Sequence, residues 1–109
     1  MTLLTEIHEQ KRAAREQLRL QTRARCRAML QTLLPAGTQV AVYGSLAKPF
    51  AFNSWSDVDL AFNELPDSLT LEKLAVELEA GLHRPVDVVL IDETRLKAAI
   101  LRKGEIWIL

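Results

Sequence analysis

The chain has 109 residues, 49% of them hydrophobic and 26% charged, and 14 basic side chains balance 14 acidic ones. This length has room for one domain with one core, so we expect a single domain over residues 1–109. The absence of an apolar run of roughly 20 residues argues against a membrane span, and no secretory leader pattern opens the chain. The single cysteine, Cys26, cannot form an internal disulfide, and this favours a soluble protein of the reducing cytoplasm.

The first third of the chain predicts a long basic helix. Residues 1–27 carry seven basic and three acidic side chains, whereas residues 28–109 carry seven basic and eleven acidic ones. Residues 1–34 are the basic N-terminal segment, and within it residues 3–34 lack Gly and Pro and are rich in strong helix formers. One arginine every four residues forms a basic ridge on the helix: Arg15, Arg19, Arg23 and Arg27. The ridge either grips RNA or an acidic partner, or is a solvated helix face.

Residues 38–109 predict the core, an α/β (α+β) fold in which helices pack on a small mixed sheet of four strands. Alternating and β-branched residues indicate the strands, at Gln39–Tyr43, Asp57–Asn63, Val86–Ile91 and Ile106–Leu109. A short helical turn and a loop are expected over residues 45–55. Thr70 is a candidate cap for a helix over residues 71–82, and Asp92 for a last helix that ends at Gly104.

Two aspartates on the second strand are the first chemical signal. Tyr43-Gly44-Ser45 is followed, after an eleven-residue spacer, by Asp57-Val58-Asp59. Side chains at positions i and i+2 of a strand share a face, so Asp57 and Asp59 can reach one or two hard cations together. Asp87 lies alone on an apolar strand. If that strand is a neighbour of the second, three carboxylates converge, and two Mg²⁺ ions are the expected ligands.

Gly44 and Ser45 offer a phosphate contact. Gly44 allows a close backbone approach, and Ser45 supplies a hydroxyl and an N–H at the start of a helical turn. Lys48 lies one turn further and can reach a phosphate as a point charge. Each feature alone has a simpler interpretation: a turn, a solvated strand face, a surface residue on an edge strand. Their order in so short a chain favours a nucleotide site.

Residues 40–63, VAVYGSLAKPFAFNSWSDVDLAFN, resemble the signature of the DNA polymerase beta-like nucleotidyltransferase superfamily. The branch they resemble most is the minimal nucleotidyltransferases, the MntA-type antitoxins of prokaryotic HEPN/MNT toxin–antitoxin pairs. That signature runs Gly-Ser, about ten residues, Asp-x-Asp, and a third acid on a later strand. Here its positions are taken by Gly44, Ser45, Asp57, Asp59 and Asp87, and Ser56 begins the matching Ser-Asp-x-Asp-Leu run. The resemblance covers roughly residues 38–109.

The resemblance implies a polymerase-beta-like catalytic core that uses ATP and two Mg²⁺ ions. It implies that AMP is transferred to a hydroxyl, a tyrosine, on a cognate HEPN toxin, which makes the chain the antitoxin of a type VII-like pair. Asp57, Asp59 and Asp87 would then be catalytic and hold the metals. Gly44, Ser45, Lys48 and Ser56 would bind the nucleotide.

Two departures from the family pattern keep other functions open. The spacer has eleven residues instead of ten, so one residue must bulge within Pro49–Trp55. Ala47-Lys48-Pro49 replaces the family's usual Ala-Arg-Gly. A catalytically impaired antitoxin that neutralises its partner by binding is one alternative. A nucleic-acid-binding protein that uses the basic helix is the other, and its affinity would fall steeply with salt.

The other candidate side chains favour structural roles. Cys26 lies in a helical stretch and is expected to pack, and His8 and His83 are expected on the surface without ligand partners. Trp55 either covers the loop or stacks on a base, and the first role is preferred. Trp107 alternates with isoleucines and is expected in the core or an interface.

Overall fold

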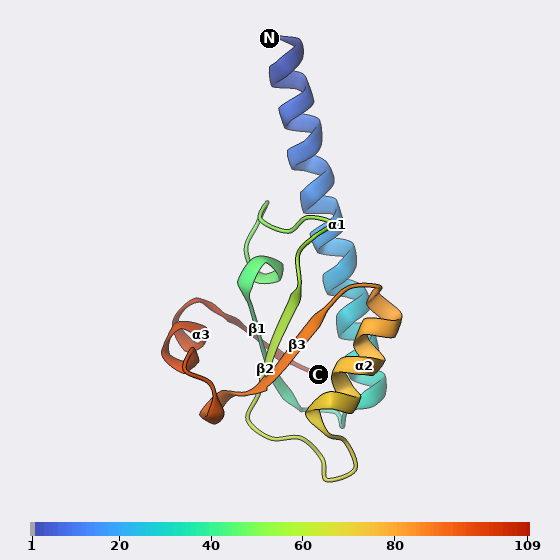
Figure 1. Ribbon diagram of the computed structural model, residues 1–109, viewed down its shortest axis with the longest axis vertical. Helices are drawn as coiled ribbons and strands as arrows, with labels where there is room; N and C mark the ends of the chain where they lie inside the picture. The colour runs from blue at the N-terminus through green and yellow to red at the C-terminus, as the bar shows by residue number, and fades with distance from the viewer. Residues whose placement is uncertain (1) are drawn as a thin grey trace.

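The computed structural model describes residues 2–109, and its fold confirms the α/β (α+β) class with a four-stranded mixed sheet (Figure 1). Within that range the elements follow in the order α1 (Leu3–Leu33), β1 (Gln39–Tyr43), η1 (Gly44–Ala47), β2 (Val58–Phe62), α2 (Leu71–Leu82), β3 (Val86–Leu90), η2 (Ile91–Glu93), α3 (Lys97–Lys103) and β4 (Glu105–Ile108). The range predicted for β1 is confirmed, and the other three strands differ from their predicted ranges by one residue at one or both ends. Asp57 therefore directly precedes β2 instead of beginning it.

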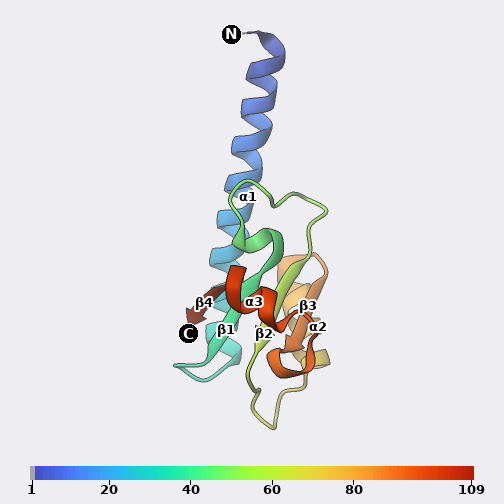
Figure 2. The ribbon, with the colours of Figure 1, turned by 90° about the vertical axis from the view of Figure 1, so that its left-hand side faces the viewer.

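The order of the strands sets where the chain's functional segments meet. The order is β3-β2-β1-β4; β1 is antiparallel to β2 and to β4, and β2 is parallel to β3. The end of β1 consequently lies at the same end of the sheet as the beginnings of β2 and β3. The opposite end carries the turn before β1 and the loop after β2 (Figure 2).

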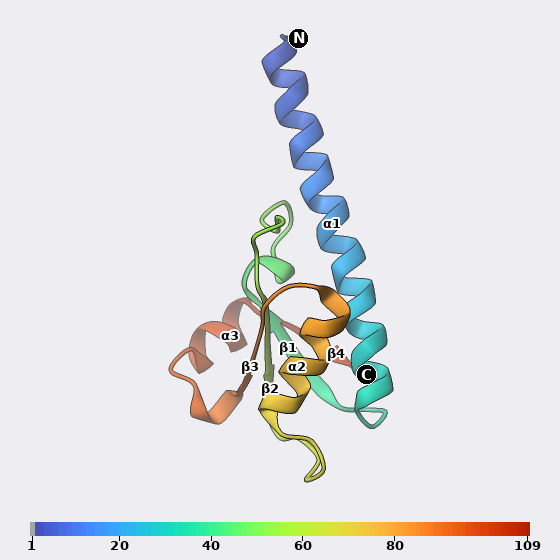
Figure 3. The same cartoon turned by 45° about the vertical axis from the view of Figure 1, so that its right-hand side comes forward.

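The two faces of the sheet are covered differently. Helices α1 and α2 pack on one face, and the short α3 covers part of the other (Figures 2 and 3). The larger core cluster joins the first two helices to the sheet and includes Cys26, Leu30, Val42, Leu60, Phe62, Leu74, Leu78 and Trp107. A smaller cluster under α3 contains Ala41, Ala61, Ile91 and Ile100. Trp107, 4% exposed, is thus a core residue, one of the two roles predicted.

Helix α1 is docked only over its second half. Thr2 caps it by accepting a hydrogen bond from the Thr5 N–H at 3.2 Å, and residues 2–15 are exposed and project beyond the sheet (Figure 1). Further along, residues spaced by three or four are buried against the body: Arg19, Thr22, Cys26 and Leu30. The projecting turns continue a helix that packing has already formed, which removes the cost of nucleation. No helix within residues 2–109 has both the length and the apolarity to cross a membrane.

The basic ridge on α1 is mostly engaged within the protein. Arg19 is 8% exposed and donates from Nη1 to the carbonyl of Leu46 at 3.0 Å. Arg23 donates to Glu105 at 2.8 Å, and Arg27 donates to the carbonyl of Ile108 at 2.8 Å. The predicted solvated face is therefore wrong for these three arginines. A four-residue spacing gives one helix face, but it does not reveal that this face is turned toward η1 and β4.

Of the two predicted helix caps, the structure confirms the one at Thr70 and contradicts the one at Asp92. Thr70 caps α2 as expected, accepting from the Lys73 N–H at 3.1 Å. The prediction that Asp92 caps α3 is wrong. Asp92 lies in η2, where its carboxylate pairs with Lys97, and α3 has no side-chain cap at its start. The extra 3-10 turn after β3 uses the residues that would otherwise have begun the helix.

Candidate active site

The predicted convergence of acidic strands is present in the sheet. Asp59 of β2 is paired in register with Tyr43 on β1 and with Asp87 on β3. These three positions form one row across the sheet, next to the point where β1 turns into η1. Asp57 stands two residues before Asp59, at the same end. The condition set by the sequence, that the strand of Asp87 adjoins the strand of Asp59, is met.

The row faces the side of the sheet that α3 covers only in part. Val58 and Leu60 point into the larger core under α1 and α2. Because side chains alternate along a strand, Asp59 points to the other face, where Ala61 packs in the smaller cluster. Asp59 is half-buried, and Asp57 and Asp87 are exposed. The carboxylates are thus at an accessible end of the sheet.

The other two carboxylates of the site affect the Asp59 carboxyl. Burial raises the pKa of the Asp59 carboxyl, and the negative charges of Asp87 and then Asp57 raise it further. Burial also raises the pKa of the Tyr43 hydroxyl to about 12, with Asp59 and Asp87 contributing. The tyrosine is therefore a neutral phenol at physiological pH. A site with this electrostatic character favours a bound cation.

Gly44 brings the backbone against the Asp59 carboxylate. Its φ is +69°, a conformation that L side chains rarely adopt, and a Cβ added there would overlap Oδ2 of Asp59. Glycine is therefore required twice, for the backbone angle and for the close approach. Ser45 follows in the first turn of η1 and is partly exposed. The structure brings Gly44, Ser45 and the acidic row together, as predicted.

The other two residues assigned to the nucleotide are placed differently. Lys48 is exposed, and its backbone N–H closes η1 on the carbonyl of Ser45 at 3.2 Å. The hydroxyl of Ser56 accepts from the Asn53 N–H at 3.0 Å and lies 3.3 Å from Asn53 Oδ1. Ser56 is thus engaged within the loop, because this loop folds on its own polar groups. Lys48 keeps an accessible side chain beside η1.

Phe50 is a strained point within the eleven-residue spacer. This residue has φ +63°, which is uncommon for a bulky side chain, and it lies inside the segment expected to bulge. Its N–H donates to Glu16 of α1 at 3.2 Å, and its ring lies under the Arg12 guanidinium at 3.9 Å from the centroid. The spacer is therefore held at Phe50 by the N-terminal helix.

Arg84 supports the loop from its other side, and sequence reasoning missed it. Its Nη1 donates to the carbonyls of Asn53 at 3.0 Å and Ser56 at 2.9 Å, and its guanidinium lies 4.4 Å from the centroid of the Phe52 ring. Burial lowers the pKa of the guanidinium, while the charge of Asp57 acts in the opposite direction. Arg84 therefore fixes the segment that leads into Asp57. Its place directly before Pro85 gives no sequence signal of this role.

Trp55 does not cover the loop. The predicted covering role is wrong because the side chain is 90% exposed, whereas Phe52 is fully buried and fills the space beneath the loop. The Trp55 N–H donates to Asn53 Oδ1 at 2.8 Å, in a turn that directs the ring outward. The stacking role stays a prediction.

The chemistry of the acidic row fits a divalent cation, although its geometry is not that of a finished metal site. Carboxylate oxygens are the ligands that Mg²⁺ prefers, and burial together with the negative charges of Asp87 and Asp57 raises the pKa of the Asp59 carboxyl. No three His, Cys, Asp or Glu side chains within residues 2–109 are gathered closely enough to hold a metal ion. The residues therefore fit Mg²⁺ by donor type and charge, and the carboxylates would have to draw together around it.

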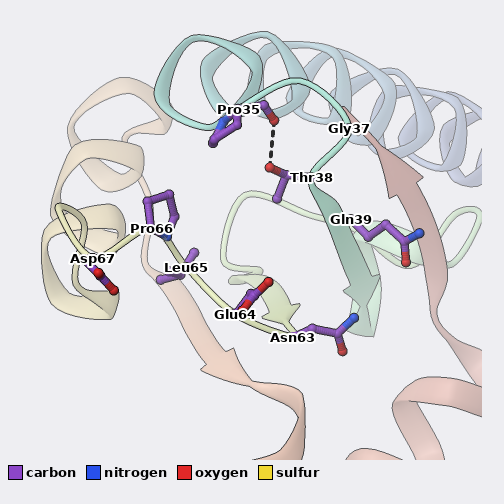
Figure 4. Close-up of a pocket in the computed structure, with 9 residues that line it drawn as sticks. All are labelled: Pro35, Gly37, Thr38, Gln39, Asn63, Glu64, Leu65, Pro66 and Asp67. Carbon is purple, nitrogen blue, oxygen red and sulfur yellow. Dashed lines mark hydrogen bonds between the residues drawn. The ribbon is translucent and has the colours of Figure 1, made fainter.

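A hollow of about 690 Å³ lies at the other end of the sheet (Figure 4). It is lined by Pro35, Gly37, Thr38, Gln39 and residues 63–67. The Thr38 hydroxyl donates to the Pro35 carbonyl at 2.7 Å on its rim. Gln39 begins β1 and Asn63 follows β2, so the length of both strands separates this hollow from the acidic row. We do not assign it to the candidate site.

The remaining predicted structural roles are confirmed. Cys26 is fully buried, and burial raises the pKa of its thiol to about 12, so it packs and does not act as a nucleophile. His8 and His83 are both exposed. His83 ends α2 in the left-handed conformation with φ +56°.

Comparison with known proteins agrees with the site. No curated protein and no solved structure is significantly similar to the chain. A family model described as a nucleotidyltransferase domain matches residues 23–106. This range contains the whole acidic row, the Gly44-Ser45 turn and the last eleven residues of α1. The chain belongs to the nucleotidyltransferase domain family, and with its fold it fits a minimal nucleotidyltransferase of the polymerase beta-like superfamily.

Proposed function

We propose that this protein is a Mg²⁺-dependent enzyme that transfers AMP from ATP to a hydroxyl group of a partner protein. The hydroxyl oxygen bonds to the α-phosphorus of ATP as the α–β phosphoanhydride bond breaks, and pyrophosphate leaves. Nucleotidyl transfer as the general reaction follows from the family. The finer assignment is supported above all by one observation: Asp59 is paired with Asp87 across β2 and β3 while the Gly44 backbone contacts Asp59. This arrangement joins a carboxylate pair to a turn that a phosphate can approach.

Each residue has a role in this proposal. Asp57, Asp59 and Asp87 would hold two Mg²⁺ ions, whose charge would neutralise the triphosphate and lower the pKa of the attacking hydroxyl. The backbone of Gly44 and the hydroxyl of Ser45 orient the terminal phosphates, with the Lys48 ammonium nearby. Asp87 is the exposed member of the paired carboxylates and receives the proton of the acceptor hydroxyl.

A protein acceptor suits the open surroundings of the acidic row. Asp57 and Asp87 are exposed, so a side chain carried by another protein can approach them. By resemblance, the acceptor is a tyrosine of a cognate HEPN toxin in the cytoplasm, and the chain is the antitoxin of that pair. Trp55 stands 90% exposed beside Asp57 and would contact either the base or this partner.

A second candidate is an antitoxin that neutralises its partner by binding alone. Two observations favour it: the carboxylates are not gathered into a finished metal site within residues 2–109, and the Ser56 hydroxyl is engaged inside the loop. The two candidates share the partner and differ in whether AMP is transferred.

The deciding experiment combines labelled ATP with Mg²⁺ or Mn²⁺ and the proteins that copurify with this chain. We expect label on a partner protein and an added mass of one or more AMP groups by mass spectrometry. Asp87→Ala should abolish transfer, whereas Asp67→Ala, an exposed acid at the opposite end of the sheet, should not. If wild type and Asp87→Ala both neutralise the partner and the mass of the partner never changes, the result would favour the second candidate, neutralisation by binding alone.

A further inference from the structure

We infer that α1 positions residues 44–50, the phosphate-binding turn of the proposed enzyme. It does so through hydrogen bonds from Arg19 and Arg23 to the Leu46 carbonyl and from the Phe50 N–H to Glu16. This inference rests on the proposed nucleotide site and gives the N-terminal helix a role in it. These three are positioning residues, because they contact the turn and not the acidic row.

The first contact holds the residue that follows Ser45. The Leu46 carbonyl accepts from Arg19 Nη1 at 3.0 Å and from Arg23 Nη1 at 3.2 Å. Leu46 itself is fully buried, so its carbonyl requires donors from the protein. Two guanidinium groups on one oxygen give charge-assisted hydrogen bonds, stronger than neutral ones. They fix the peptide between Leu46 and Ala47, which lies inside η1 directly after the Gly44-Ser45 turn.

The second contact holds the far end of the same segment. Glu16 forms a bidentate pair with Arg19, at 2.5 Å from Nε and 3.0 Å from Nη2. The same carboxylate accepts from the Phe50 N–H at 3.2 Å, and Arg12 stacks on the Phe50 ring. Side chains of α1 therefore hold the segment at residue 46 and at residue 50, and Lys48 lies between these two points.

The strain at Phe50 supports this role. A bulky residue at φ +63° is costly, and such a conformation persists only where the surroundings impose it. The surroundings here are the side chains of α1. Arg23 also pairs with Glu105 of β4, so the helix is tied to the sheet that carries the acids. Without these contacts the segment 44–50 would relax, and its phosphate-binding groups would be oriented less well.

The experiment compares variants on one helix of the full chain. Arg19→Gln removes the guanidinium that donates to both the Leu46 carbonyl and Glu16. Arg23→Gln is a milder change at a more accessible arginine. Arg19→Lys keeps the positive charge and one donor group, the ammonium. Arg27→Gln is the matched control: it has the same charge change but contacts Ile108 and Trp107, away from the turn. Amide hydrogen exchange of residues 46–51 reports the turn, and the affinity for Mn²⁺–ATP reports the site.

We expect faster exchange at residues 48, 50 and 51 and about tenfold weaker Mn²⁺–ATP binding in Arg19→Gln, the size expected for a lost charge-assisted hydrogen bond. The KM for ATP should rise with kcat little changed, Arg19→Lys should recover part of the affinity, and Arg27→Gln should match wild type. If Arg19→Gln does not fold, Arg23→Gln shows the same pattern at smaller size.

Three outcomes overturn the inference in different ways. If the Arg19 and Arg23 variants have the same amide exchange rates and the same Mn²⁺–ATP affinity as Arg27→Gln, α1 does not position the turn. Faster exchange with unchanged ATP affinity shows that the turn is held but is not used for the nucleotide. If the wild-type protein binds no Mn²⁺–ATP, both the proposed function and this role of α1 are wrong. The exchange data would then show only that α1 stabilises the turn.

Discussion

A methyl group added at Gly44 should disable the site far more than it destabilises the fold. The new Cβ would overlap Oδ2 of Asp59, and the backbone there has φ +69°. Gly37 provides the matched control. It also has a positive φ, +86°, but nothing lies within 4 Å of an added Cβ. Gly44→Ala and Gly37→Ala therefore share the backbone cost and differ in the collision with Asp59.

The expected magnitudes follow from that comparison. An L residue in the left-handed region costs about 1–2 kcal/mol, and the reduced freedom of the unfolded chain offsets about 0.4–1 kcal/mol of it. Each variant should thus lose about 1 kcal/mol, or about 4–8 °C in Tm for a domain of this size. Oδ2 ends a short, rotatable side chain, so the carboxylate can swing away at little further cost. A displacement of about 1 Å in a reacting group can reduce the rate roughly a hundredfold.

The assay is urea and thermal unfolding beside AMP transfer to the copurified partner. Both variants should unfold earlier by similar amounts, and only Gly44→Ala should lose about two orders of magnitude in transfer. Transfer by Gly44→Ala at the level of Gly37→Ala would refute the reasoning, because Asp59 would not then need the position that Gly44 leaves open for it.

Two further predictions concern ionisation. Burial, and then the charges of Asp87 and Asp57, raise the pKa of Asp59, so its negative charge destabilises the folded state as pH rises above the ordinary carboxyl value of 3.8. Asp59→Asn should therefore raise the urea midpoint of the metal-free protein at pH 7. That gain should vanish below pH 3.8 in urea titrations, and an equal gain at pH 3 would contradict the assignment. Cys26, whose pKa burial raises to about 12, should react with a disulfide reagent at pH 8 roughly a thousandfold more slowly than the unfolded chain; an equal rate in folded and unfolded protein would place it outside the core.

The acidic row could be predicted because its signals are local. Alternation along β2 separates Asp59 from the core residues Val58 and Leu60, and an isolated aspartate on an apolar strand marks Asp87. A parallel pairing of these two strands, joined by α2, follows from general rules of strand connection. Gly44 was identified for backbone freedom, but its contact with the Asp59 carboxylate depends on the antiparallel register of β1 and β2, which spacing alone does not give.

The supports of the site could not be predicted because they join segments distant in sequence. Arg84 reaches the carbonyls of Asn53 and Ser56, about thirty residues away, with no motif around it. The ridge on α1 was visible as a pattern, yet the pattern does not say which way the helix turns when it docks. Trp55 was expected to cover the loop on the ground that it is large and apolar. Phe52 already fills that space, and this depends on the path of the loop.

The side on which α1 docks explains how a neutral chain keeps an acidic site. The arginines of the helix are drawn to Glu16, Glu105 and backbone carbonyls, and the helix packs on the face opposite Asp59. Its positive charge is thus compensated away from the acidic row. The cation that acts on Asp57 is Arg84, whose side chain is already bound to the loop. Asp59 and Asp87 consequently retain the mutual repulsion that a divalent cation would relieve, so the helix can support the phosphate turn without neutralising the carboxylates that need the metal.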